Sequence, residues 1–321
     1  MANETQGVFT LSDVRDATLN LTWVAQGWSF GWVGCGQNTP GTYRSDFDRI
    51  TFSSDLVTAS ARGNSAQNGH MRGNGVGNNL DGWSAGGGPH TSPAATSSTS
   101  RMIFATDSAT GVAKGALTTN KANPMTTTDN SNGYWGGSYT PSSLSTVDKL
   151  IFATDTAAAV AKGPLSAARY QMHGGGDRST VGYSVGGALG PVLSTVDKII
   201  FASDTATAVA KGSLTTIKRF NGVASKSTDL WTNGSAVVCT VDRIIFASDT
   251  ATAVAKGSMV VHVQQAAGTD NFSTDGWWSG GQDVPGATKY SSVQRLIFST
   301  DTATMTSRGV LNTQRRDSIG F

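Results

Sequence analysis

Six aspartates recur at one position of a repeated segment, and they are the first residues in this chain that could carry chemistry. They are Asp55, Asp107, Asp155, Asp204, Asp249 and Asp301. A ring of carboxylates could hold calcium, but calcium needs about six to eight oxygens converging on one point. Each copy supplies one aspartate preceded by serine or threonine, which favours side chains that bond the N–H groups of their own turns. We therefore expect structural turn residues and no metal.

The other acidic residues and the histidines offer little for catalysis. Glycoside hydrolysis usually needs two carboxyl groups with different pKa values, and Glu4 is the only glutamate, so such a pair would consist of aspartates. No aspartate pair outside the repeats stands out. Zinc needs three or four converging ligands, but the histidines fall at non-equivalent repeat positions. They are His70, His90, His173 and His262. We expect solvated or hydrogen-bonded histidines and no cofactor, although three of them could face a central channel.

Half of the basic residues also follow the repeat. One stands three residues before each anchor phenylalanine and another directly before each closing glycine. They are Arg49, Arg101, Lys149, Lys198, Arg243 and Arg295, then Arg62, Lys114, Lys162, Lys211, Lys256 and Arg308. Asp48, Asp148, Asp197 and Asp242 stand beside the first set. With an even distribution and a net charge of +2, ion pairing along adjacent strands is favoured over a nucleic-acid surface, which needs clustered basic charge.

All these residues belong to one segment that is written six times. Its anchor phenylalanines lie 45 to 52 residues apart at Phe52, Phe104, Phe152, Phe201, Phe246 and Phe298. A period near 50 indicates a propeller or solenoid built from one supersecondary unit. In every copy eight residues separate the turn aspartate from a glycine, as from Asp155 to Gly163. This constant hairpin length maintains the register, because a slip of one residue would turn each side chain to the wrong face.

The third copy predicts four strands. Residues 145–153 are rich in β-branched and apolar residues and predict a strand buried on both faces. A turn at 154–156 leads to a strand at 157–162, then one at 170–174, and finally 182–187, where an aromatic residue precedes two glycines. The aromatic residues of this last strand supply apolar area for packing and are also our candidate ligand contacts. They are Trp83, Tyr134, Trp135, Tyr183, Trp231, Trp277 and Trp278.

Four strands per unit, a period near 50 and a glycine doublet after an aromatic residue resemble the kelch repeat of β-propellers. The resemblance covers residues 28–321, but small residues replace the tryptophan of the outer kelch strand. The last copy leaves residues 312–321, enough for one strand, and the first begins with the aromatic strand at 28–36. We therefore predict an all-β, six-bladed, kelch-like propeller closed by pairing of its N- and C-terminal strands.

The first 27 residues form a separate leader. Ser12 is a suitable N-cap for a short helix within residues 10–23, which would pack on the propeller or attach it to a larger assembly. The start has no basic and apolar regions of a secretory signal, and no apolar run approaches the roughly 20 residues of a membrane span. Cys35 and Cys239 fall in distant units and predict free thiols, consistent with assembly in a reducing cytoplasm.

The segments that precede the aromatic strands differ most between copies. They are rich in Asn, Asp, Ser, Thr and Gly and comprise residues 68–81, 122–132, 174–180 and 267–275. We expect them to emerge as loops on one face of the ring. Adaptable polar loops on a rigid scaffold suit recognition of glycans or protein surfaces, although they could also be solvated connectors.

The recurrent string S-T-V-D-K/R-I-x-F-x-x-D-T-A-T…K/R-G-x-L is complete at residues 145–165 and 194–214. It is similar to the kelch-like repeats of tailed-bacteriophage virion appendages, particularly those of cyanophages. The resemblance implies a non-enzymatic virion protein of a tail fibre or decoration, made in the bacterial cytoplasm, that helps attach the particle to its host. Its partners would be other virion proteins, contacted through the leader or one propeller face, and a host-surface glycan or receptor. A homo-oligomer is compatible with this role.

Two alternatives from other classes stay open. A carbohydrate-active propeller enzyme would place a cluster of acidic side chains at the channel mouth. The turns resemble those of sialidases only weakly, because the S/T-D-T-A-T pattern lacks their glycine and tryptophan. An intracellular protein-interaction module would more often carry a further domain.

Overall fold

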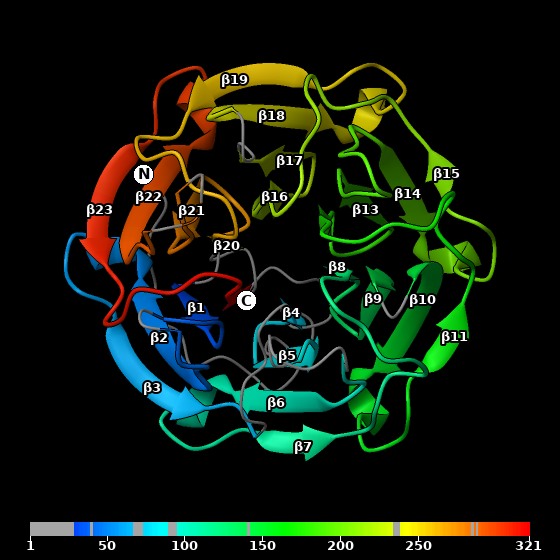
Figure 1. The fold of residues 1–321 in the computed structure, drawn as a ribbon, viewed down its shortest axis with the longest axis horizontal. Helices are drawn as coiled ribbons and strands as arrows, with labels where there is room; N and C mark the ends of the chain where they lie inside the picture. The colour runs from blue at the N-terminus through cyan, green and yellow to red at the C-terminus, as the bar shows by residue number, and fades with distance from the viewer. Residues whose placement is uncertain are drawn as a thin grey trace, which may run out of the picture.

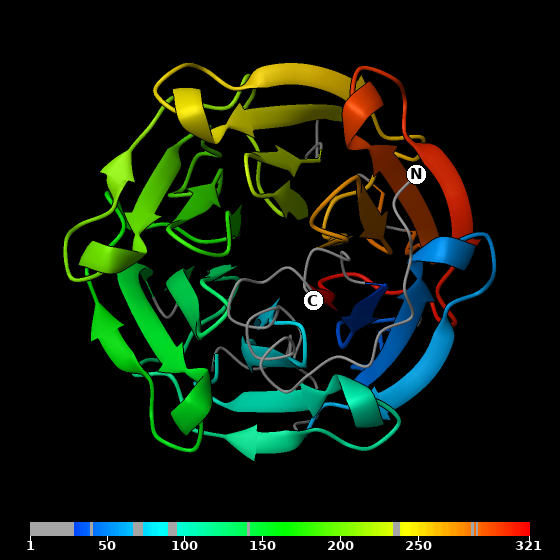
Figure 2. The same ribbon diagram turned by 180° about the vertical axis from the view of Figure 1, so that it is seen from behind.

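The computed structural model describes residues 29–38, 41–66, 73–88, 95–139, 142–233, 238–283, 286 and 288–321. Within them the chain forms six four-stranded antiparallel sheets. The sheets stand side by side around one axis and form a closed ring (Figures 1 and 2). The predicted all-β fold and the six-bladed propeller are confirmed. The expected leader helix, and also His70 and His90, lie outside the described residues.

Five blades consist of four strands that follow one another in the chain from the axis outward. Blade 2 has β4 (Gly73–Gly77), β5 (Asp81–Gly86), β6 (Thr99–Ile103) and β7 (Val112–Lys114). Blade 3 has β8 (Met125–Thr128), β9 (Asn132–Tyr139), β10 (Ser143–Ile151) and β11 (Val160–Lys162). Blade 4 has β12 (His173–Gly176), β13 (Val181–Val185), β14 (Val196–Ile200) and β15 (Val209–Ala210). Blade 5 has β16 (Val223–Lys226), β17 (Asp229–Thr232), β18 (Thr240–Ile245) and β19 (Val254–Ser258). Blade 6 has β20 (Ala267–Asp270), β21 (Asp275–Ser279), β22 (Ser292–Ile297) and β23 (Thr306–Val310).

Blade 1 is assembled from both ends of the described chain. Its outer strands are β1 (Phe30–Gly34), β2 (Asp46–Thr51) and β3 (Ser60–Asn64), and its innermost strand is β24 (Ile319–Gly320). Val33 lies opposite Gly320, and the Phe321 N–H donates to the Trp32 carbonyl at 3.1 Å. The predicted closure is therefore confirmed. The C-terminal strand lies at the centre of the ring in Figure 1.

The hairpin of each blade contains a short 3₁₀ turn that begins at the anchor phenylalanine. The turns are η1 (Phe52–Ser54), η2 (Phe104–Thr106), η3 (Phe152–Thr154), η4 (Phe201–Ser203), η5 (Phe246–Ser248) and η6 (Phe298–Thr300). The strand predicted at 145–153 is β10, which ends at Ile151 with that residue exposed. The strand predicted at 157–162 shortens to β11, because the turn continues further than the sequence pattern indicates. Burial on both faces is thus limited to the middle of β10.

The core is divided into layers between neighbouring blades. One layer contains Trp83 from blade 2 together with Trp135, Leu150 and Phe152 from blade 3. Another joins Tyr134 and Val147 from blade 3 to Ile199 and Phe201 from blade 4. Each sheet therefore buries its apolar side chains against the next sheet, and the stability of one blade depends on its neighbours.

Candidate functional site

The repeated aspartates hold neighbouring blades together. The Asp155 carboxylate of blade 3 receives the Trp83 indole N–H at 2.9 Å, and Lys114 Nζ and Arg101 Nη1 of blade 2 lie at 3.0 and 3.4 Å. We call this arrangement of one carboxylate and three donors from the preceding blade an inter-blade clasp. It recurs in the other five blades at Asp55, Asp107, Asp204, Asp249 and Asp301, with tyrosine replacing tryptophan at Asp204 and Asp249.

The closing glycine completes each clasp through the backbone. The Gly163 N–H donates to the Asp204 carbonyl oxygen at 2.8 Å. A Cβ atom at Gly163 would lie only 1.9 Å from the Ala206 carbonyl oxygen of blade 4. The five equivalent glycines have the same hydrogen bond and the same lack of room. This contact leaves no room for a side chain and explains why the position is glycine in every copy.

The anchor phenylalanine stacks on the aromatic residue that donates to the clasp. Phe152 lies parallel to Trp83, with ring centroids 3.7 Å apart, and Phe298 lies against Trp231 at 3.9 Å. The Tyr134–Phe201 pair is looser at 4.9 Å. Because the phenylalanine and the aspartate belong to one hairpin, stacking and hydrogen bonding fasten the same two blades.

These clasps correct the role predicted for the turn aspartates. We expected them to bond the N–H groups of their own turns, but the backbone meets this need: the Ala157 N–H donates to the Thr154 carbonyl at 2.9 Å. The carboxylate of Asp155 is left to reach the preceding blade. Burial alone would raise the pKa of Asp204, but hydrogen bonds from Lys149 and Lys162 lower it, which keeps the carboxylate ionised.

The seven aromatic residues proposed as ligand contacts lie in the packed space between blades. None is more than 1% exposed: Trp83, Tyr134, Trp135, Tyr183, Trp231, Trp277 and Trp278. Five of them donate to clasps, while the Trp135 indole donates to the Asn74 carbonyl at 3.1 Å and Trp278 packs in the layer between blades 5 and 6. In this conformation a ligand in solvent can reach none of them, because the neighbouring sheet covers each ring.

A second set of buried ion pairs lies at four blades. Arg169 Nη2 and Asp197 Oδ2 are 2.9 Å apart and both side chains are 0% exposed. The equivalent pairs are Arg315–Asp48, Lys121–Asp148 and Lys218–Asp242. In each pair the cation comes from the connector, meaning the segment between the outermost strand of one blade and the innermost strand of the next.

The partners predicted for these aspartates are therefore wrong. The basic residues that stand three before each anchor phenylalanine all point to the clasps. Among the described residues, three of these six also pair along an adjacent strand, with other aspartates: Arg101–Asp81, Arg243–Asp229 and Arg295–Asp275. In blade 6 both members of the buried pair change together. Val263 takes the place of the cation, and Gln294 takes that of the aspartate and bonds the Val261 backbone.

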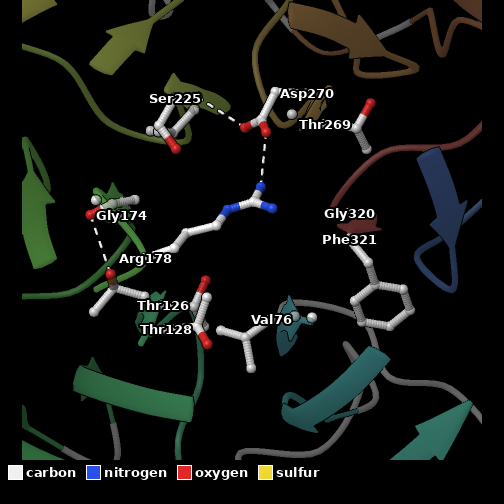
Figure 3. A pocket seen from close by; sticks show the side chains of 17 residues that line it. Val76, Thr126, Thr128, Gly174, Arg178, Ser225, Thr269, Asp270, Gly320 and Phe321 are labelled. Atoms are coloured by element: carbon white, nitrogen blue, oxygen red, sulfur yellow. Dashed lines mark hydrogen bonds and ion pairs between the residues drawn. The ribbon is translucent and has the colours of Figure 1, made fainter. Parts of the chain in front are cut away.

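A cavity of about 80 Å³ lies on the axis and is lined by the innermost strands. Figure 3 shows Arg178 from blade 4 reaching across it to Asp270 of blade 6, where the two side chains are 2.7 Å apart. Asp270 also accepts the Ser225 N–H at 2.8 Å, which joins blades 4, 5 and 6. Burial raises the pKa of Asp270, while the Arg178 charge opposes this shift. Neither residue was singled out from the sequence, because the other copies of the repeat do not have arginine or aspartate at the equivalent positions.

Five short turns surround the end of the cavity at which Arg178 and Asp270 lie. We call them the rim turns; they join the innermost and second strands of blades 2 to 6 at residues 78–80, 129–131, 177–180, 227–228 and 271–274. Asn78, Asp129, Asp177 and Asn271 each bond the N–H groups of their own turn. Asn78 Nδ2 also donates to the Asn130 carbonyl at 3.4 Å, and Asn130 Nδ2 donates to the Arg178 carbonyl at 2.9 Å.

The variable segments are therefore less loop-like than expected. Within the described residues, each one contains residues of an innermost strand, namely β4, β8, β12 or β20, and its exposed residues lie only in its rim turn. Their glycines permit the close approach of strands near the axis: a Cβ at Gly174 would lie 2.5 Å from the Thr126 carbonyl oxygen of blade 3. The sequence therefore varies both in the innermost strands, which form the walls of the channel, and in the rim turns.

The remaining predictions concern cysteines, histidines and metals. Cys35 of blade 1 and Cys239 of blade 5 are both free, as expected. His173 lies on β12 at the channel, where burial lowers its pKa to about 4. Among the described residues, His, Cys, Asp and Glu form no group of three that could hold a metal. No helix in the same residues is long and apolar enough to cross a membrane.

Comparison with known proteins adds no family. No protein-family model matches the chain, and no curated protein matches its sequence.

Proposed function

We propose that this chain is a non-enzymatic virion protein of a tailed bacteriophage that recognises a host-surface glycan with its rim turns. The virion role rests on the resemblance of its repeats to those of phage appendages. The glycan role rests on the contrast between six nearly identical clasps and rim turns that differ in every described blade. Amide, hydroxyl and carboxyl groups on these turns match the hydroxyl-rich surface of a sugar.

Preorganisation of the rim is the observation that carries the binding proposal. Side-chain bonds within the turns, and the bonds from Asn78 to Asn130 and from Asn130 to Arg178, hold the rim before a ligand arrives. Binding to a rigid surface costs less ordering entropy than binding to a mobile one. Exposed groups such as Ser131 and Ser273 project from the same turns.

A glycan array tests the binding face. Ser131→Arg and Ser273→Arg place bulk on the rim without removing any side-chain bond seen there, and each should weaken glycan binding at least about tenfold. Thr156→Arg, on the exposed hairpin of blade 3, is the matched control and should bind like the unmodified chain. Equal binding by all three variants, or enrichment of protein ligands alone, would contradict glycan recognition by the rim.

Mass spectrometry of purified particles tests the virion role separately. We expect the chain in intact particles at a fixed ratio to the major structural proteins. It would be held there by other virion proteins through residues 1–27 or one propeller face, with or without self-association. Its absence from the particles would end the virion proposal and leave the rim experiment unaffected.

A further inference from the structure

The axial cavity inside the rim is wide at one end and narrow at the other. It measures about 80 Å³, which is room for roughly five to eight water-sized species. At the opposite end of the channel the connectors leave a cavity of only about 10 Å³, lined by Gln171 and Gln265 among others. Backbone bonds tie these connectors together: the Gln171 N–H donates to the Asn123 carbonyl at 3.1 Å, and the Gln265 N–H to the Phe220 carbonyl at 2.7 Å. One sugar ring can therefore enter from the rim, but a longer chain has no way through.

The walls of the wide cavity consist mainly of backbone and hydroxyl groups. Seven of its lining residues are glycines, and Thr126, Thr128 and Ser225 add hydroxyl groups. In the described part of the chain the innermost strands are the inner edges of their sheets, so alternate N–H and C=O groups point towards the axis. Sugar hydroxyls both donate and accept hydrogen bonds, and such walls offer partners of both kinds.

Two charged side chains line the cavity, and they balance each other. Arg178 Nη2 and Asp270 Oδ1 are 2.7 Å apart (Figure 3). The Ser225 N–H and the Phe272 N–H donate to the same carboxylate at 2.8 and 3.1 Å. Asp270 would repel an acidic sugar and Arg178 an amino sugar, and each would compete with a buried ion pair, whose disruption is strongly destabilising. An uncharged sugar leaves the pair intact, because its hydroxyls accept from a guanidinium and donate to a carboxylate.

The rim turns hold Arg178 in a backbone conformation that few side chains adopt. Arg178 and Phe272 have φ of 56° and 54°, and Asn130, at the same place in the rim turn of blade 3, has φ of 67°. The left-handed region is unusual for bulky residues, and such strain is concentrated at binding sites. The guanidinium carbon of Arg178 lies 4.4 Å from the centroid of the Phe272 ring. The two strained positions together therefore fix the guanidinium at the cavity.

We propose that the axial cavity binds one uncharged sugar residue at the end of a glycan chain, with Arg178 and Asp270 as the pair that recognises it. The inference rests on the proposed rim function and narrows the class of ligand. The glycan meets the propeller end-on, its terminal ring enters the cavity, and the rings behind it lie among the rim turns. Glycans that present only internal residues, or an acidic residue at the tip, would bind weakly.

Pairs of arrayed glycans that differ only in the terminal residue test the proposal. Removal of a neutral terminal sugar by an exoglycosidase, or its replacement by glucuronic acid, should weaken binding at least about tenfold. Arg178→Asn should cause a similar loss; it keeps the carbonyl that accepts from Asn130, and Asn130 itself shows that asparagine suits this backbone. The double variant Arg178→Asn, Asp270→Asn leaves no carboxylate without its cation and should bind as weakly as the single variant.

Arg44 provides the matched control, because it is bonded to Asp46 at 2.6 Å in the segment between β1 and β2, away from the rim turns. Arg44→Asn should bind like the unmodified chain. Three results would overturn the end-on proposal and leave glycan recognition by the rim intact: binding that survives removal of the terminal sugar, a preference for acidic termini, or full binding by Arg178→Asn. An array without any bound glycan would end both proposals.

Discussion

The outer hairpins and the axial ends of the blades follow opposite rules. At the hairpins, every blade repeats the same carboxylate, cations, aromatic ring and glycine, and each set faces the next blade. At the axis, the connectors place Asn, Gln, Phe, Gln and Asp at one equivalent position, and the rim turns differ from one another. Repetition thus accompanies contacts between blades, and variation accompanies surfaces that face the channel or solvent. Substitutions should show the same division.

The largest effect should come from a buried pair that fastens a connector to its blade. Asp197→Ala leaves the Arg169 guanidinium buried without its carboxylate and should reduce the free energy of unfolding by about 3–5 kcal/mol. The chain provides its own control in blade 6, which has valine and glutamine at these positions. The double variant Arg169→Val, Asp197→Gln should recover more than half of the loss in urea unfolding. No recovery would show that the two positions are not coupled.

A backbone contact of the clasp should rank next. Gly163→Ala pushes a methyl group against the Ala206 carbonyl oxygen, so blades 3 and 4 must separate, at a cost of about 3 kcal/mol. Chemical denaturation measures this loss. Ala161→Ser, two residues earlier and exposed, should change the free energy of unfolding by less than about 0.5 kcal/mol. A tolerated Gly163→Ala would mean that the invariant glycine has another cause.

The clasp carboxylate should have a smaller effect. Asp155→Asn keeps the shape but removes the charge that Arg101 and Lys114 share, and we expect a loss of about 1.5–3 kcal/mol. Because Arg101 is 27% exposed, salt should reduce the difference between the variant and the unmodified chain. Tm measured at low and high sodium chloride tests both points, and an unchanged Tm would argue that the stacked rings alone hold the blades.

The smallest effect should be a pH-dependent loss of stability caused by His173, which lies on β12 at the channel. Burial lowers the pKa of His173 to about 4, below its unfolded value of about 6.5. Between these values the unfolded chain binds a proton that the folded chain does not, so stability falls as pH drops from about 6.5 towards 4. His173→Gln should flatten this part of the profile. Parallel profiles for His173→Gln and the unmodified chain would exclude this cause.

Some of the architecture could be predicted because it is local or periodic. The interval between copies indicated blades, the constant step from aspartate to glycine indicated one hairpin length, and the residues left at the two ends indicated closure of the ring. The same periodicity misled us about the roles of individual side chains. For example, Asp155 and Trp83 are 72 residues apart, and no feature of the sequence between them indicates that their side chains form a hydrogen bond.

The sequence by itself determined the number of blades, the strand content and the separation of the two cysteines, because hydrophobic pattern and turn chemistry act over a few residues. Only the tertiary structure decided which carboxylate meets which cation, that the aromatic rings are buried, and that Arg178 meets Asp270 at one end of the channel while the connector glutamines line the other end. Those contacts join residues from different blades. Their positions depend on how six sheets pack around one axis, which no single copy of the repeat encodes.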